Sequence, residues 1–216
     1  MSDPISVIIP VKTLAGAKSR LAGRLSPDER MRLARALLAH VLEVVADVEA
    51  VERCLVVSPD PEVIEIARLA GADSIVEGDD QLSRGHNAAL EQARSTIQLD
   101  RPRAVLVLAS DLPLLTRHDI EGMAALAYED RMVIIGPDRR GLGTNALLLR
   151  PIDALPFCFG TDSFEQHRRE AARRGLAVSV YRSDGVAFDL DYPEDLDELE
   201  RVVGDRARFS FGVRGL

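Results

Sequence analysis

Tryptophan is absent from this sequence, and cysteine and histidine are scarce: its 216 residues include two cysteines and four histidines. Cys54 and Cys158 lie far apart, which excludes a disulfide framework and the close spacing of a redox or zinc motif. We therefore expect two reduced thiols in a cytoplasmic protein. The histidines are scattered along the chain and predict no zinc centre; they are His40, His86, His118 and His167.

Positive charge and long apolar runs are also lacking. The 27 basic and 35 acidic residues give a net charge of −8, which argues against a nucleic-acid partner. No apolar stretch is long enough to cross a bilayer, and the first residues do not resemble a signal peptide. We expect no membrane partner. Basic residues in loops become the more informative ones.

A buried strand is predicted over residues 104–109, where apolar residues follow one another almost without a break. Pro113 prevents this strand from continuing as a central one. Asp111 comes directly after it, and open α/β sheets bind ligands just outside the carboxyl ends of their strands. Asp111 is therefore a candidate functional carboxylate; the alternative is an aspartate that caps the following turn.

Strands and helices alternate in the first third of the chain. This βαβαβ order predicts an α/β fold, a single domain with a doubly wound, mostly parallel, Rossmann-like sheet between flanking helices. We expect the domain to cover residues 1–204 and residues 205–216 to form a C-terminal tail. The predicted elements are strands over 5–10, 53–58 and 73–76 and helices over 27–47 and about 61–71.

A loop rich in cations follows the first strand. Lys12, Lys18 and Arg20 stand in it among small residues, which suits a polyphosphate, and Arg24 lies nearer the next helix. The loop has neither the Gly-Lys-Ser/Thr ending of a P-loop nor the glycine pattern of a dinucleotide-binding turn. We predict that Lys12, Lys18 and Arg20 bind nucleotide phosphates and act in catalysis; a solvated basic turn is the alternative.

A second polar loop, residues 77–87, is a candidate for binding a nucleotide base. Gly85 would let a flat base approach the backbone, and the Asn87 amide could both donate to and accept from a base edge. The alternative is an ordinary helix N-cap region.

Two later loops could hold a second anion, the acceptor of a transferred group. Thr144 and Asn145 precede an apolar strand, and Gly160 and Ser163 stand where a loop enters a helix with free N–H groups. His167 would share a helix face with Ser163, or lie as an ordinary histidine on the helix surface.

Two further carboxylates, Asp189 and Asp191, are two residues apart at the end of an extended segment predicted over 186–191, so they should project to the same side. With Asp111 at the same sheet edge they would form an oxygen site suited to Mg²⁺. Such a site beside a cationic loop predicts phosphoryl or nucleotidyl transfer.

Six segments of the chain form a recognisable pattern: VIIPVK, AKSRLA, ASDLP, GLGTNALLL, FGTDSFEQH and FDLDYPEDL. Together they resemble the 2-phospho-L-lactate and phosphoenolpyruvate guanylyltransferase family of coenzyme F-420 biosynthesis. The resemblance extends from Val7 to Leu199, and its most specific part is the segment FGTDSFEQH. The family often has a threonine where this chain has Asn145.

This resemblance implies a nucleotide-diphospho-sugar transferase-like fold, GTP and Mg²⁺ as substrate and cofactor, and a small phosphorylated carboxylic acid as acceptor. Phosphoenolpyruvate, 2-phospho-L-lactate and 3-phosphoglycerate are the candidates within the family. Two alternatives stay open: a nucleotidyltransferase for another acceptor, such as a sugar phosphate or a molybdopterin, and a non-catalytic nucleotide-binding module. A homodimer also stays open.

Overall fold

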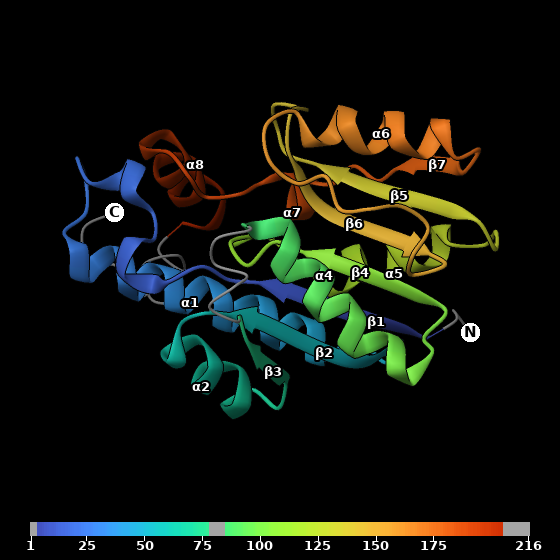
Figure 1. The fold of residues 1–216 in the computed structure, drawn as a ribbon. Coiled ribbons are helices and arrows are strands. Elements are labelled where there is room, and N and C mark those ends of the chain that lie inside the picture. Colours follow the sequence, from blue (N-terminus) through green and yellow to red (C-terminus); the bar gives the residue numbers. More distant parts are fainter. Residues whose placement is uncertain (1–3, 78–84, 205–216) are drawn as a thin grey trace.

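The computed structural model describes residues 4–77 and 85–204, and Figure 1 shows their arrangement. The expected tail at 205–216 and the part of the candidate base-binding loop at 78–84 lie outside these residues. No helix in the described ranges is both long and apolar enough to cross a bilayer.

One seven-stranded sheet organises the described chain, in the order β3-β2-β1-β4-β6-β5-β7. All neighbouring strands are parallel except at β6, which is antiparallel to both β4 and β5. The predicted mostly parallel α/β fold is thus confirmed. The strands are β1 (Ile5–Pro10), β2 (Val51–Ser58), β3 (Asp73–Val76), β4 (Ala104–Leu108), β5 (Met132–Pro137), β6 (Thr144–Arg150) and β7 (Ala177–Val180).

Helices cover both faces of the sheet because successive strand residues point to opposite sides. On β1, Val7 and Ile9 pack in one apolar core while Ile8 packs in the other. Residues of α1 (Pro27–Ala46), α2 (Pro61–Leu69), α5 (Arg117–Leu126) and α7 (Asp184–Ala187) join the first core. Residues of α4 (His86–Ile97) and α6 (Ser163–Arg173) join the second.

The reversed direction of β6 decides which residues reach the carboxyl edge of the sheet. Residues 138–143 form a short connection from β5, and such connections join antiparallel strands. The start of β6 therefore lies beside the end of β4, where the N–H of Ala109 donates to the carbonyl of Asn145 at 2.8 Å. This places Thr144 and Asn145 next to the segment that carries Asp111.

The prediction of an extended segment over residues 186–191 is wrong at its start. Residues 184–187 form the short helix α7, because the Ser183 hydroxyl accepts from the N–H of Val186 and caps a helical turn. The chain then runs on to α8 (Pro193–Val203). Between the two helices Phe188 and Leu190 are buried, so that Asp189 and Asp191 alternate with them as predicted.

A third apolar cluster fixes this segment against the cationic loop. Phe188 and Leu190 pack with two leucines of α8 and with leucines from the loop and α1. The loop contains two single turns, η1 (Leu14–Gly16) and η2 (Ser19–Leu21). The members of the cluster are Leu21, Leu25, Leu33, Leu37, Phe188, Leu190, Leu196 and Leu199. The cluster holds the late acidic segment beside Lys18 and Arg20.

Gly136 on β5 provides a test of how closely α7 packs on the sheet. A methyl group there would lie 2.5 Å from Val186 Cγ1 and 3.1 Å from Ala146 Cβ. We expect Gly136→Ala to lower the free energy of unfolding by about 1–3 kcal/mol in urea titrations. Gly23→Ala is the matched control, since no heavy atom lies within 4 Å of the added methyl group. Equal stability of the two variants would contradict this packing.

Candidate active site

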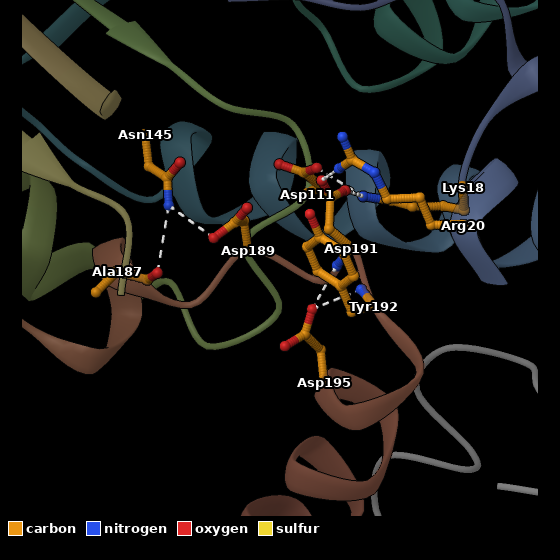
Figure 2. A network of polar contacts seen from close by, with 9 residues as sticks. All are labelled: Lys18, Arg20, Asp111, Asn145, Ala187, Asp189, Asp191, Tyr192 and Asp195. Atoms are coloured by element: carbon orange, nitrogen blue, oxygen red, sulfur yellow. Dashed lines mark hydrogen bonds and ion pairs between the residues drawn. The ribbon is translucent and has the colours of Figure 1, made fainter. Parts of the chain in front are cut away.

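Three carboxylates gather at the carboxyl edge of the sheet, together with a buried lysine (Figure 2). Asp111 follows β4, and Asp189 and Asp191 follow α7. Lys18 Nζ lies 2.6 Å from Asp111 Oδ2 and 3.2 Å from Asp191 Oδ1. Arg20 Nη1 lies 2.5 Å from the other oxygen of Asp191. The structure thus brings together five of the residues that the sequence assigned to nucleotide and metal.

Lys18 is held in an uncommon way. Its backbone has a φ of +54°, in the left-handed region that side chains other than glycine rarely adopt, and its side chain is only 7% exposed. Burial lowers the pKa of Lys18, but Asp111 and Asp191 raise it by more, so the ammonium stays charged. The lysine therefore neutralises part of the negative charge of the cluster.

Asp189 carries the clearest sign of crowded negative charge. Burial and the nearby Asp111 raise its pKa to about 6, and Asp191 adds to this effect. Asn145 partly opposes the shift, because its Nδ2 lies 3.3 Å from Asp189 Oδ1. The same nitrogen donates to the carbonyl oxygens of Val186 at 3.0 Å and Ala187 at 3.3 Å. Asn145, assigned to the acceptor from sequence, thus positions Asp189 and the end of α7.

The chemistry of this cluster fits a hard divalent cation, although its present arrangement is closed by Lys18. Carboxylate oxygens are the ligands that Mg²⁺ prefers, and an added cation would relieve the repulsion that raises the pKa of Asp189. Within residues 4–77 and 85–204, no three acidic, histidine or cysteine side chains are already spaced to hold a metal. Lys18 Nζ stands between Asp111 and Asp191 instead.

A cavity of about 440 Å³ opens on one side of the carboxylates. Lys12, Lys18, Asp111, Asp191 and Thr144 line it. A neighbouring cavity of about 250 Å³ shares Lys12 and is lined by Gly85 and His86. Gly85 has a φ of +80°, and a Cβ there would meet open space. Lys12 and His86 therefore line both of two adjacent cavities, and Gly85 lines the smaller one.

Asn87 does not offer its amide to these cavities. Its Nδ2 donates to the carbonyl of Phe159 at 3.0 Å, and its Oδ1 accepts from the N–H of the same residue at 2.9 Å. Both ends of the side chain are thus used to attach α4 to the loop before α6. The base-binding role that the sequence suggested for Asn87 stays a prediction, and the contacts of the side chain are structural.

A second cavity, of about 370 Å³, lies on the other side of Asp191. Asp189, Asp191 and Gly160 line it together with Arg20, Arg139 and Arg140. The sequence analysis missed Arg139 and Arg140, although two adjacent arginines in the loop before β6 could have indicated an anion site. Arg139 forms an ion pair with the buried Asp195, and in the described chain no carboxylate pairs with Arg140.

Tyr192 joins two of these cations. The Arg140 guanidinium lies 4.1 Å and that of Arg20 4.9 Å from the centre of its ring. Asp195 accepts from the N–H groups of Asp191 at 2.8 Å and Tyr192 at 2.6 Å. These bonds fix the backbone that carries Asp191 at the start of α8.

The remaining acceptor candidates lie at different depths. Thr144 lines the larger cavity and Gly160 the second one, whereas Ser163 is 2% exposed in the first turn of α6. His167 is fully buried, so the alternative of a surface histidine is wrong. Its ring packs edge-on against Phe159, with the ring centres 4.9 Å apart.

Comparison with known proteins agrees with this geometry. A model of the family described as "Guanylyl transferase CofC like" matches residues 5–207. The chain belongs to this guanylyl transferase family. It is 45% identical over 204 residues to phosphoenolpyruvate guanylyltransferase of Rubrobacter xylanophilus, covering 94% of this chain and 97% of that protein. It is 38% identical over 192 residues to 2-phospho-L-lactate guanylyltransferase of Methanothermobacter thermautotrophicus, covering 89% and 82%.

Solved structures show the same fold. A protein assigned as a nucleotide-diphospho-sugar transferase of Desulfovibrio desulfuricans matches with a TM-score of 0.77 at 17% identity, covering 97% of this chain and 93% of that one. Glucosyl-3-phosphoglycerate synthase of Mycobacterium tuberculosis, in complex with Mn²⁺ and uridine diphosphate, matches with a TM-score of 0.63 at 15% identity, covering 98% and 81%. This guanylyl transferase therefore has the predicted nucleotide-diphospho-sugar transferase-like fold.

The raised pKa of Asp189 predicts a pH-dependent effect on the stability of the metal-free enzyme. An acid with a pKa of about 6 in the folded chain and 3.8 as its ordinary value costs stability above pH 6. That cost disappears as the pH falls from 6 through 3.8. Asp189→Asn should therefore raise the free energy of unfolding by about 1–3 kcal/mol at pH 8 and by much less at pH 4.

Urea titrations with a chelator at the two pH values measure this difference. Asp197→Asn is the control: Arg24 lowers the pKa of Asp197, so this variant should gain no stability at pH 8. An equal gain for Asp189→Asn at both pH values would contradict the electrostatic origin of the effect.

Proposed function

We propose that this guanylyltransferase transfers GMP from GTP to phosphoenolpyruvate and releases pyrophosphate, with Mg²⁺ as cofactor, within coenzyme F-420 biosynthesis. The observation that carries the proposal is the position of Asp191, which lines both cavities. Lys12 and Lys18 line the larger one, and Arg20, Arg139 and Arg140 line the second one beside five aspartates. A transferase needs its donor and its acceptor to meet at one phosphorus atom. Two cavities that each offer cations and that share a carboxylate of the cluster meet that need.

GTP would occupy the 440 Å³ cavity, with its phosphates beside Lys12 and Lys18. Its base would extend towards Gly85 and His86 in the adjoining cavity. Burial and the charge of Lys12 lower the pKa of His86, so this ring stays neutral next to a purine. Preference for guanine over adenine would come from hydrogen-bonding groups at the exocyclic positions.

The acceptor would extend from the second cavity, where Gly160, Arg20, Arg139 and Arg140 lie, to Thr144 in the larger cavity, where its reacting oxygen would meet the α-phosphate of GTP. An oxygen of its phosphate attacks the α-phosphorus, the bond to the β-phosphate oxygen breaks, and pyrophosphate leaves. A phosphate dianion needs no protein base for this step. Asp111, Asp189 and Asp191 would hold Mg²⁺, whose charge polarises a phosphate oxygen; the Mn²⁺ of a protein with the same fold supports a divalent cation.

We propose phosphoenolpyruvate rather than 2-phospho-L-lactate as the acceptor, because the relative that is 45% identical to this chain is named phosphoenolpyruvate guanylyltransferase. Apolar surfaces discriminate weakly between such three-carbon acids, by about 1–3 kcal/mol.

Pyrophosphate release tests the proposal directly. We expect turnover with GTP and phosphoenolpyruvate, slower turnover with 2-phospho-L-lactate and 3-phosphoglycerate, and little with ATP. A sugar phosphate and a molybdopterin serve as acceptors of other classes. Turnover only with those would replace the acceptor, and nucleotide binding without any pyrophosphate release would indicate a binding module.

Removing one carboxylate should abolish most of the activity. We expect Asp111→Asn and Asp191→Asn each to lower kcat more than about a hundredfold, roughly 2.7 kcal/mol in the barrier. Asp197→Asn is the matched control, because it loses only a surface ion pair with Arg24 and should keep near-normal kcat. Near-normal kcat in both site variants would contradict a catalytic carboxylate cluster.

A further inference from the structure

Buried His167 makes two hydrogen bonds that together determine where its proton lies. The backbone N–H of Cys158 lies 3.0 Å from Nε2, and Thr144 Oγ1 lies 3.1 Å from Nδ1. A backbone N–H can only donate, so Nε2 has to be the unprotonated nitrogen. Burial also lowers the pKa of His167 to about 4, so that the ring is neutral at physiological pH. Nδ1 therefore carries the proton and donates a hydrogen bond to the Thr144 hydroxyl oxygen.

The donor at Cys158 is itself fixed in place. The next residue, Phe159, is bound at both its N–H and its carbonyl by the Asn87 amide. The Phe159 ring packs edge-on against the imidazole on one side and edge-on against His86 on the other, with centres 4.9 Å and 5.7 Å apart. The orientation of the His167 ring is thus set from α4, through Asn87 and Phe159.

This arrangement determines how Thr144 can act. Its oxygen already accepts a hydrogen bond from His167 Nδ1, and in the described chain no other hydrogen bond of Oγ1 is present. The hydroxyl hydrogen is therefore free to point away from the imidazole. Thr144 is 8% exposed and lines the same cavity as Lys12, Lys18 and Asp111. A hydroxyl whose hydrogen points into the cavity can donate to an anion there, while its second lone pair stays available to accept.

We propose that His167 is a positioning residue, which holds the Thr144 hydroxyl as a hydrogen-bond donor for an anionic group of the acceptor acid. The identity of that ligand rests on the proposed function, whereas the hydrogen bond between His167 and Thr144 is independent of it. It also assigns a use to a buried histidine that the transfer step does not need as a base.

A double-mutant cycle separates this role from a merely structural one. His167→Phe should raise the KM for phosphoenolpyruvate about tenfold, because a tenfold change in affinity corresponds to the loss of one neutral hydrogen bond. The KM for GTP should change less than about twofold. Thr144→Val should have a similar effect, whereas Thr144→Ser, which keeps the hydroxyl, should restore the KM. In the Thr144→Val background, His167→Phe should add no further rise. His118→Phe, at a histidine that is 84% exposed, is the control.

The proposal would be overturned if His167→Phe raised the KM for the acid by the same factor in the wild-type and in the Thr144→Val background. His167 would then act by some route other than Thr144. A rise in the KM for GTP equal to that for the acid would overturn it as well. The assay uses whichever of the three candidate acids supports turnover.

Nitrogen NMR of the ring in the wild-type protein tests the geometry without any activity or variant. We expect the signals of a neutral imidazole protonated at Nδ1 across pH 6 to 8. A proton on Nε2, or a charged ring, would overturn the proposal. If no candidate acid gives turnover, the proposed function fails and the ligand part of this inference fails with it, while the nitrogen signals still decide the tautomer.

Discussion

Repulsion among three carboxylates is the constraint on which the site depends. Asp111, Asp189 and Asp191 come from two segments that are about eighty residues apart, and burial together with their proximity raises the pKa of Asp189 to about 6. Lys18 compensates part of this charge with two ion pairs from a buried position. A cluster of this kind gains stability from any cation that enters it. Such a site is suited to bringing a metal ion and a charged phosphate together.

The apolar cluster beneath the acids provides the force that holds them there. Phe188 and Leu190 are buried with leucines of the cationic loop, α1 and α8, while the intervening Asp189 and Asp191 project towards the two cavities. Asp195 adds hydrogen bonds to the backbone of Asp191 and Tyr192. Burial of several large side chains thus supplies the favourable free energy that offsets the electrostatic cost of the cluster.

The reversed strand β6 adds the side of the site that we propose for the acceptor. Because β6 starts at the edge where β4 ends, Thr144 lines the nucleotide-sized cavity and Asn145 holds Asp189. The same hydrogen-bonded region extends through His167, Phe159 and Asn87 to α4. Residues that look like separate loop motifs in the sequence therefore belong to one connected support around the site.

The sequence alone was sufficient to predict the alternation of strands and helices, because apolar runs and helix caps such as Ser26 and Thr116 act within a few residues. It also predicted Asp111 at the end of a central strand, since the end of a buried run is a local feature. The pairing of Asp189 and Asp191 on one side followed from their spacing, although residues 184–187 turned out to be helical.

Only the tertiary structure decided the roles of side chains whose partners are distant in sequence. Asn87, Asn145 and His167 were assigned to ligands or to the surface, yet their contacts lie within the protein, 72, 44 and 23 residues away along the chain. Arg139 and Arg140 lie beside Tyr192 and Asp195 only because the loop after β5 meets the start of α8 at one cavity. Local patterns determine which element forms, whereas a polar side chain's partner depends on how elements pack, and packing brings together residues that no sequence spacing relates.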